Sequence, residues 1–216
     1  MNIGIIGTGI VGQTLGTKLV QLGHSVKMGS RSGGNEKTTA WAEAAGNNAS
    51  VGTFADAANH GEIIFNCTSG MVSLDALHAA GEENLEGKIL IDVSNPLDFS
   101  KGFPPTLSVC NDDSVGEQIQ RAFPKAKVVK TLNTVNCQLM VNPALVPGEH
   151  DLFVSGNSTD AKVEVTRILK EWFGWKNVID LGDITTARGV EQLLPIWVRL
   201  MSLFKSAQFN FHIARP

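Results

Sequence analysis

Three glycines close to the start of the chain have the spacing of a dinucleotide-binding turn. Gly7, Gly9 and Gly12 form the pattern G-x-G-x-x-G, between an apolar run over residues 2–6 and a run of helical spacing over residues 10–22. In such a motif the first glycine permits a tight turn, the second lets the backbone approach a pyrophosphate, and the third lets helix and strand pack closely. The amides and the dipole of the helix N-terminus then face the phosphates. The pattern therefore predicts a dinucleotide site, and the alternative is a glycine-rich turn without a ligand.

The residues after the second predicted strand indicate which dinucleotide is bound. An NAD site usually has Asp or Glu at this point, where the carboxylate binds the ribose 2′-hydroxyl. This chain has Ser30 and Arg31 instead. An arginine can form a bidentate pair with a 2′-phosphate, and the Ser30 hydroxyl can donate a hydrogen bond to it. We therefore expect NADP(H) in preference to NAD(H), the alternative being that Arg31 is only a solvated loop residue.

Three stretches of small, neutral, hydrogen-bonding residues follow later predicted strands, at residues 68–70, 94–96 and 132–136. Ligands of open α/β sheets bind at the carboxyl ends of the strands, where these stretches would meet. None of the three contains His, Asp, Glu or Lys, which argues against a reaction that needs a strong general acid or base. Hydride transfer between two stacked redox cofactors has no such need, because the protein supplies orientation and excludes water.

Some of these residues also have a purely structural interpretation. Thr68 and Ser69 either contact a ligand or cap the helix predicted from Ser73. Asn95, which precedes Pro96, is suited to a ligand contact and equally to a turn. Both interpretations remain open at the level of sequence.

Short apolar runs alternate with helical stretches through the first two thirds of the chain, a pattern typical of a parallel sheet covered by helices. The predicted strands are residues 2–6, 25–28, 62–66, 88–93, 127–130 and 151–155, and the predicted helices are residues 10–22, 36–45, 73–80, 114–123 and 158–173. A loop at 143–148, a strand at 177–181 and a helical tail at 185–204 complete the pattern. We expect an α/β fold of the Rossmann type with a doubly wound, mostly parallel sheet. Residues 1–148 would form the NADP-binding domain, and residues 149–216 a small C-terminal α/β and helical extension that completes the acceptor cleft.

The helical tail has more apolar residues than one buried stripe requires. They are Leu193, Leu194, Ile196, Trp197, Leu200, Met201, Leu203 and Phe204. We therefore expect the tail to close one wall of the cleft and to pair with a second subunit in a homodimer.

The composition excludes several classes of protein. The 216 residues include 18 Lys and Arg against 21 Asp and Glu, a net charge of −3, which supplies no basic field for nucleic acid. The longest apolar candidate for a membrane span, residues 193–204, is too short and is interrupted by Pro195 and Arg199. The three cysteines are widely spaced and form no C-x-x-C pair, which predicts no metal site and favours a reducing cytoplasm.

Five separated stretches share the motifs of one protein family. They are Gly7-Thr8-Gly9 to Gly12, Gly29-Ser30-Arg31, Asp92-Val93-Ser94-Asn95-Pro96, Val128-Val129-Lys130-Thr131-Leu132-Asn133-Thr134 and Ala187-Arg188-Gly189-Val190-Glu191 to Pro195. On these stretches the chain resembles, over nearly its whole length, the coenzyme F420-dependent NADP oxidoreductase family. It also resembles the related soluble reductase domain of the six-transmembrane metalloreductases.

The resemblance implies roles for individual residues. Besides the three glycines, the NADP(H)-binding residues would be Thr8, Ile10, Val11, Ser30 and Arg31, with Lys37 as a further phosphate contact. The nicotinamide end of the cofactor site would include Thr68, Ser69, Asn95, Pro96, Val135 and Cys137. Hydride would pass between nicotinamide C4 and C5 of a stacked deazaflavin, with Asn133 and Thr134 as the catalytic residues that position the acceptor ring.

One position distinguishes the two groups that the chain resembles. The archaeal deazaflavin enzymes have a histidine where this chain has Asn133, whereas the metalloreductase domains have an asparagine. The acceptor is therefore deazaflavin F420 or a flavin, FMN or FAD. Because the metalloreductases hold their flavin and haem with a membrane domain, we expect a soluble acceptor here, or one supplied by another protein.

Other functions remain as alternatives. An NADPH-dependent flavin or ferric reductase and a non-catalytic NADPH-binding sensor are both compatible with the neutral cleft. A hydroxyacid dehydrogenase or imine reductase begins with a similar cofactor domain, but it adds a large helical domain, for which too few residues follow Leu181.

Overall fold

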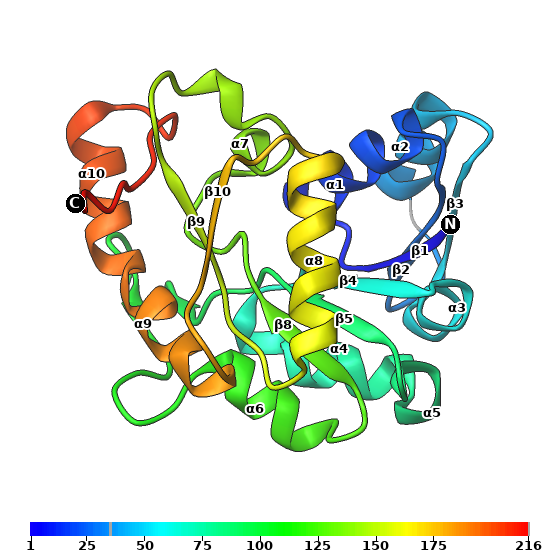
Figure 1. Ribbon diagram of the computed structural model, residues 1–216. Helices are drawn as coiled ribbons and strands as arrows, with labels where there is room; N and C mark the ends of the chain where they lie inside the picture. The colour runs from blue at the N-terminus through cyan, green and yellow to red at the C-terminus, as the bar shows by residue number, and fades with distance from the viewer. Residues whose placement is uncertain (35, 216) are drawn as a thin grey trace.

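A six-stranded parallel sheet forms the centre of the protein in the computed structural model, which describes residues 1–34 and 36–215 and, of Lys37, the backbone alone. Its strands are β1 (Asn2–Ile6), β2 (Ser25–Ser30), β3 (Ala49–Thr53), β4 (Ile63–Asn66), β5 (Ile89–Asp92) and β8 (Lys127–Lys130). Their order is β3-β2-β1-β4-β5-β8, and every neighbouring pair is parallel. This is the strand order of a Rossmann fold, in which the direction of winding reverses between β1 and β4. The predicted fold class is confirmed (Figure 1).

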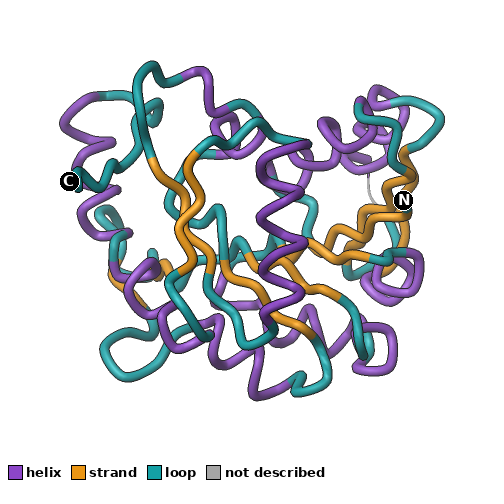
Figure 2. Tube along the Cα trace, viewed as in Figure 1, coloured by secondary structure: helices purple, strands orange, loops and turns teal. Residues whose placement is uncertain are grey.

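Helices cover both faces of the sheet (Figure 2). One face packs against α1 (Ile10–Gln21), α2 (Glu36–Ala45), α7 (Cys137–Val141) and α8 (Thr159–Glu171), and the other against α3 (Phe54–His60), α4 (Ser73–Ala80), α5 (Glu82–Leu85) and α6 (Val115–Ala122). Each face has its own cluster of buried apolar side chains, with Ile3 and Ile5 in one and Ile6 and Ile64 in the other. The strands therefore read as continuous apolar runs because both of their faces are buried.

The residues after the central sheet form a small extension. Its strands β9 (Asp151–Val154) and β10 (Asn177–Asp180) pair in parallel, and one antiparallel bridge from Ser155 to Lys130 joins them to β8. Leu152 and Val154 belong to the same apolar cluster as Ile3. The extension thus shares the core of the first part of the chain, and the division at residue 148 stays a prediction.

The tail that was predicted as helical consists of three pieces. A 3-10 turn (Ile184–Thr186) leads into α9 (Ala187–Gln192), and α10 (Leu194–Phe204) follows with Pro195 in its first turn. The long connection after β5 contains a two-stranded antiparallel pair, β6 (Leu97–Asp98) and β7 (Thr106–Leu107). The sequence did not predict β3, α3, α5, α7, β6 or β7.

Candidate functional site

A cavity of about 310 Å³ lies at the carboxyl edge of the sheet, where β1, β4 and β5 end. It is lined by Gly9, Ile10, Val11, Cys67, Thr68, Ser69, Val93, Ser94, Asn95, Leu97 and Phe99. The strand order reverses at this point, and open α/β sheets bind their ligands there because the loops diverge to opposite faces. The cavity is therefore the candidate site.

The three motif glycines have three different steric environments. Gly7 has a φ of +113°, which favours glycine, and its amide donates to the carbonyl of Gly29 at 3.2 Å. A Cβ on Gly12 would lie 2.3 Å from the Gly7 carbonyl oxygen, so helix α1 can approach the turn only without a side chain there. A Cβ on Gly9 would meet nothing within 4 Å. Gly9 therefore leaves the backbone open on the side from which a phosphate would approach.

Helix α1 begins directly at this turn. Gly9 is its N-cap residue, and Ile10 and Val11 are its first two residues, so their amides lie in the turn where a helix has no internal acceptors. The carbonyl of Thr8 accepts a hydrogen bond from Gln13 Nε2 at 3.0 Å, which fixes the loop to the helix. Ile10 is 72% exposed and borders the cavity with Val11. The start of α1 can therefore bind an anion.

The end of β2 also fits a phosphate-bearing ribose. The Ser30 hydroxyl is buried and has no hydrogen-bond partner among the described residues. Arg31 follows it on the surface, and no carboxylate in the described part of the chain pairs with it. The side chain of Lys37, predicted as a further phosphate contact, lies outside the described residues. An unpartnered hydroxyl beside an exposed guanidinium provides donors that suit a 2′-phosphate.

The loop after β4 is held by a hydrogen-bond network of its own. The Thr68 hydroxyl lies 2.7 Å from Asn66 Oδ1 and 2.8 Å from the Ser73 hydroxyl. Ser69 begins a 3-10 turn (Gly70–Val72) and makes no side-chain capping bond. The alternative in which Thr68 or Ser69 caps α4 does not apply, because the N-cap of α4 is Val72, which makes no side-chain capping bond. Thr68 and Ser69 both line the cavity.

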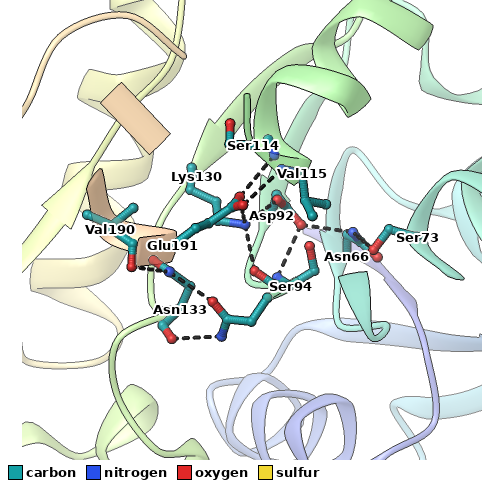
Figure 3. A network of polar contacts seen from close by, with 12 residues as sticks. Asn66, Ser73, Asp92, Ser94, Ser114, Val115, Lys130, Asn133, Val190 and Glu191 are labelled. Atoms are coloured by element: carbon teal, nitrogen blue, oxygen red, sulfur yellow. Dashed lines mark hydrogen bonds and ion pairs between the residues drawn. The ribbon is translucent and has the colours of Figure 1, made fainter. Parts of the chain in front are cut away.

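The loops after β5 and β8 are joined by a pair of asparagines, Asn95 and Asn133, of which Figure 3 labels Asn133. Asn95 Nδ2 donates to the carbonyl of Asn133 at 2.8 Å, and Asn133 Nδ2 donates to Asn95 Oδ1 at 3.0 Å. Asn133 Nδ2 also donates to the carbonyl of Val190 at 3.1 Å, and Asn133 is only 4% exposed. The Asn95 carbonyl in turn accepts the amide of Gly70 at 3.0 Å. These bonds fix the cavity wall after β5 to the loops after β4 and β8.

The structure separates the predicted residues of the nicotinamide end and the two predicted catalytic residues into two groups. Thr68, Ser69 and Asn95 line the cavity beside the glycine turn. Pro96, Asn133, Thr134, Val135 and Cys137 do not line it; Thr134 and Val135 are buried, and Cys137 is the first residue of α7. Four lining residues, Cys67, Val93, Leu97 and Phe99, were not predicted as ligand contacts, and Phe99 is 57% exposed at the rim. Leu97 and Phe99 lie in the long connection after β5, and its length was the only signal for them in the sequence.

The described residues that line the cavity have only weakly acidic or neutral side chains. The described residues that line the cavity include no carboxylate, lysine or histidine. Burial raises the pKa of the Cys67 thiol well above its usual value, and the charge of Asp92 adds to this effect, so the thiol stays protonated. The Ser94 hydroxyl is buried and has no partner among the described residues. The cavity can therefore orient a ligand and exclude water, but it offers no strong acid or base.

A fully buried charge cluster lies directly behind this wall, and the sequence did not predict it. Lys130 Nζ lies 2.8 Å from Asp92 Oδ2 and 2.8 Å from Glu191 Oε1, and all three side chains are at most 1% exposed (Figure 3). Burial alone would lower the pKa of Lys130, but the two carboxylates outweigh it, and the pKa lies above its usual value. The ammonium is therefore charged, and the pairing offsets the cost of burying it.

Comparison with known proteins assigns the chain to a family. A family described as NADP oxidoreductase, coenzyme F420-dependent, matches residues 2–96. A solved structure from Arthrobacter sp. FB24, described as a candidate F420-dependent NADP reductase, is 51% identical, with full coverage of both chains (100% each) and a TM-score of 0.94. The chain belongs to this family. The resemblance predicted from five separated sequence stretches is thereby confirmed.

Two further proteins extend the comparison. Metalloreductase STEAP3 of Rattus norvegicus is 31% identical over 205 residues, which are 90% of this chain and 37% of that protein. The chain thus spans little more than a third of the curated relatives it matches. A reductive aminase from Aspergillus terreus in complex with NADPH shares the fold, with 17% identity and a TM-score of 0.66 over 94% of this chain and 62% of that one. The family to which the chain belongs is described as one of NADP oxidoreductases. In the described residues no helix is long and apolar enough to cross a membrane.

Proposed function

We propose that the protein transfers a hydride between NADP(H) and a deazaflavin acceptor of the coenzyme F420 type. The observation that carries the proposal is the position of the cavity at the sheet reversal, between the start of α1 and a neutral wall that includes Thr68, Ser69, Ser94 and Asn95. An anion-binding helix terminus on one side and a wall without acid or base on the other suit a dinucleotide whose reactive ring meets a second ring.

In this proposal the dinucleotide is held by the motif turn and the end of β2. The backbone of Gly7, Thr8, Gly9 and Gly12 shapes the turn, and the amides of Ile10 and Val11 face the pyrophosphate. Ser30 and Arg31 bind the 2′-phosphate, together with Lys37. The preference for NADP(H) rests on the unpartnered Ser30 hydroxyl and on the exposed Arg31, for which the described residues provide no carboxylate partner.

The other end of the cavity would receive the reacting rings. We propose that Thr68, Ser69 and Asn95 contact the nicotinamide, that Pro96, Val135 and Cys137 support this end of the site from outside the cavity lining, and that Asn133 and Thr134 position the acceptor. Bound NADP(H) supplies or accepts the hydride at its C4 carbon. Asn133 is buried with its amide engaged, so it acts by holding the two loops at a fixed separation.

The proposed reaction needs no acid or base from the cavity wall. NADPH, the oxidised acceptor and one proton give NADP⁺ and the dihydro-acceptor, and the two electrons move with the hydride. The acceptor nitrogen takes its proton from solvent, because no described cavity residue is a carboxylate, lysine or histidine. The apolar side chains of Val93, Leu97 and Phe99 exclude water from the contact between the rings.

A flavin is the second candidate acceptor. The observation that favours it is Asn133 together with the relationship to metalloreductase STEAP3, which covers 90% of this chain. A flavin ring presents the same flat apolar surface as a deazaflavin ring, so the apolar wall accommodates either. An FMN or FAD acceptor would make the protein an NADPH-dependent flavin reductase.

The oligomeric state and the cellular location are separate proposals. Helix α10 leaves Ile196, Leu203 and Phe204 exposed by 51%, 72% and 55%, and we propose that a second copy of the chain covers them in a homodimer. Light scattering at micromolar concentration should give twice the mass of the chain, and the mass of a single chain would exclude the dimer. The three free cysteines are consistent with the cytoplasmic location predicted from the sequence.

The acceptor is tested by stopped-flow absorbance of the purified protein with NADPH and, in parallel, coenzyme F420, FMN and FAD. We expect saturable reduction of F420 at a rate above that of either flavin. Reduction of FMN or FAD alone would support the second candidate. Tight NADPH binding without turnover of any acceptor would contradict both and support a sensor.

A further inference from the structure

The ammonium of Lys130 has three acceptors, one for each of its protons. Besides Asp92 and Glu191, Lys130 Nζ donates to the backbone carbonyl of Ser94 at 2.6 Å. Ser94 lies in the wall of the cavity. The buried ammonium of Lys130 therefore holds the backbone of the cavity wall at Ser94 in addition to the two carboxylates.

The two carboxylates of the cluster are satisfied on their other sides. Asp92 Oδ1 accepts Asn66 Nδ2 at 2.8 Å and the amide of Ser94 at 3.2 Å. Glu191 accepts the amides of Val115 at 2.8 Å and Gly116 at 3.0 Å, which are the first residues of α6. The excess negative charge of the cluster therefore faces the positive end of a helix dipole.

The cluster and its neighbour hold both loops of the site. The backbone of Ser94 is held on both sides, its amide by Asp92 and its carbonyl by Lys130. The residue before Glu191 is Val190, whose carbonyl accepts the amide of Asn133. Two consecutive residues of α9 thus support the loop after β5, through Lys130, and the loop after β8 directly (Figure 3).

We propose that Glu191 and Lys130 are positioning residues that set the distance between the two loops at the reacting end of the cavity. The inference rests on the proposed hydride transfer and assigns to α9 a part in it. Among the described residues, the hydrogen bonds and ion pairs of the cluster reach neither the glycine turn nor the end of β2, so we expect binding of the dinucleotide phosphates to depend little on it. Turnover does, because a small displacement of the reacting groups can lower a rate about a hundredfold.

The decisive variant is Glu191→Gln, which keeps the size of the side chain. The carboxylate of Glu191 accepts three donors, from Val115, Gly116 and Lys130. A carboxamide has one acceptor atom, its oxygen, so its NH₂ group must face at least one of these donors, and the hydrogen bond from that donor is lost.

Glu117→Gln is a matched control for the structural cost. Glu117 is a buried carboxylate on α6, 5% exposed, and it also accepts three donors, from Ser114 Oγ and from Arg188 Nε and Nη2. Arg188 belongs to α9, so Glu117 joins α6 to the same helix as Glu191 does, but the hydrogen bonds of Glu117 among the described residues reach neither cavity loop. If the two variants lose the same amount of stability and both show a given effect, we attribute that effect to the loss of stability.

Both variants are compared with the unaltered protein by thermal unfolding, NADPH titration, steady-state kinetics with F420 and FMN, and amide hydrogen exchange. In Glu191→Gln we expect kcat to fall by about tenfold to a hundredfold. The Kd for NADPH should stay within about twofold, since the phosphate-binding elements are untouched. Exchange should accelerate in peptides covering residues 94–96 and 131–136. Glu117→Gln should leave kcat and these two peptides unchanged.

Two results would overturn the assignment of positioning residues. One is equal loss of kcat in both variants, and the other is unchanged exchange in both loops of Glu191→Gln. If the unaltered protein reduces no acceptor, the proposed function fails, and the exchange comparison alone decides whether Glu191 holds the loops. Faster exchange at both loops in Glu191→Gln only would then support the assignment, and unchanged exchange would refute it.

Discussion

The contrasting environments of Gly9 and Gly12 give opposite expectations for the same substitution. In Gly12→Ala the new Cβ would lie 2.3 Å from the Gly7 carbonyl oxygen, so the turn and α1 must separate. Overpacking of this kind costs roughly 1–3 kcal/mol. The amides of the α1 start then move as well, so we expect Gly12→Ala to lose both stability and NADPH binding.

Gly9→Ala should keep its stability. Gly9 has φ −73° and ψ −179°, which alanine adopts without strain, and its Cβ would meet no atom within 4 Å. Alanine restricts the unfolded chain more than glycine does, which stabilises the folded protein by about 0.4–1 kcal/mol. Alanine is also a poorer N-cap residue than glycine, and this offsets a similar amount. The methyl group would nevertheless occupy the approach of the pyrophosphate. We expect NADPH to bind at least about tenfold more weakly, which is about 1.4 kcal/mol.

Differential scanning fluorimetry and calorimetric titration with NADPH measure the two effects side by side. Gly189→Ala is the control, because its Cβ also meets nothing within 4 Å and the residue lies in α9, away from the turn. Unchanged NADPH affinity in a folded Gly9→Ala would refute the placement of the pyrophosphate at this turn.

Three further predictions concern specificity, pH and thiol chemistry. Arg31→Ala should weaken NADPH binding by about 1.5–3 kcal/mol and leave NADH binding nearly unchanged, because a charge-assisted bond to the 2′-phosphate is lost; equal losses in parallel titrations would contradict the NADP(H) assignment. The hydrogen bond and charge of Arg121 lower the pKa of Asp113 to about 2, so its contribution to stability is present above the unfolded pKa of about 3.9 and is lost as the pH falls toward 2. Asp113→Asn should remove this part of the pH dependence of the unfolding free energy. The change should be less than about 1 kcal/mol, because Arg121 is largely exposed. If the unfolding free energy of Asp113→Asn and of the unaltered protein falls with the same slope at acid pH, the prediction is wrong. Of the three thiols, Cys67 should react slowest with a disulfide reagent, since it is buried and its pKa is raised, and three equal rates would show that the cavity opens.

The parts of the fold that the sequence predicted are those with strong local signals. The run at residues 2–6, the glycine turn and the helix from Ile10 agree with β1 and α1 because a buried parallel strand and an amphipathic helix each leave a clear pattern. Strand β3 and helix α3 were missed because residues 49–60 are mostly small or polar. The capping box of Thr53 and Asp56 was the available signal for α3.

The candidate site was predictable where it follows chain order and not where it depends on distant contacts. The loops after β4 and β5 were expected at the cavity because parallel strands end at one edge of the sheet, and they line it. The loop after β8 was expected there as well, but its residues do not line the cavity. The charge cluster was missed because Asp92 and Lys130 become partners only through the pairing of β5 with β8, and Glu191 only through the packing of α9. Opposite charges at the ends of two apolar strands were the signal that could have indicated it.

Direct hydride transfer across the cavity is tested most directly with NADPH deuterated at C4. Each C4 diastereomer is mixed with coenzyme F420 and the protein, and the reduced acceptor is examined by mass spectrometry and proton NMR. Because the hydride would move between two rings held in one orientation, one diastereomer should deliver its deuterium to C5 of the deazaflavin and the other should not. Reduction without deuterium at C5 from either diastereomer, or no reduction although NADPH binds, would contradict the account.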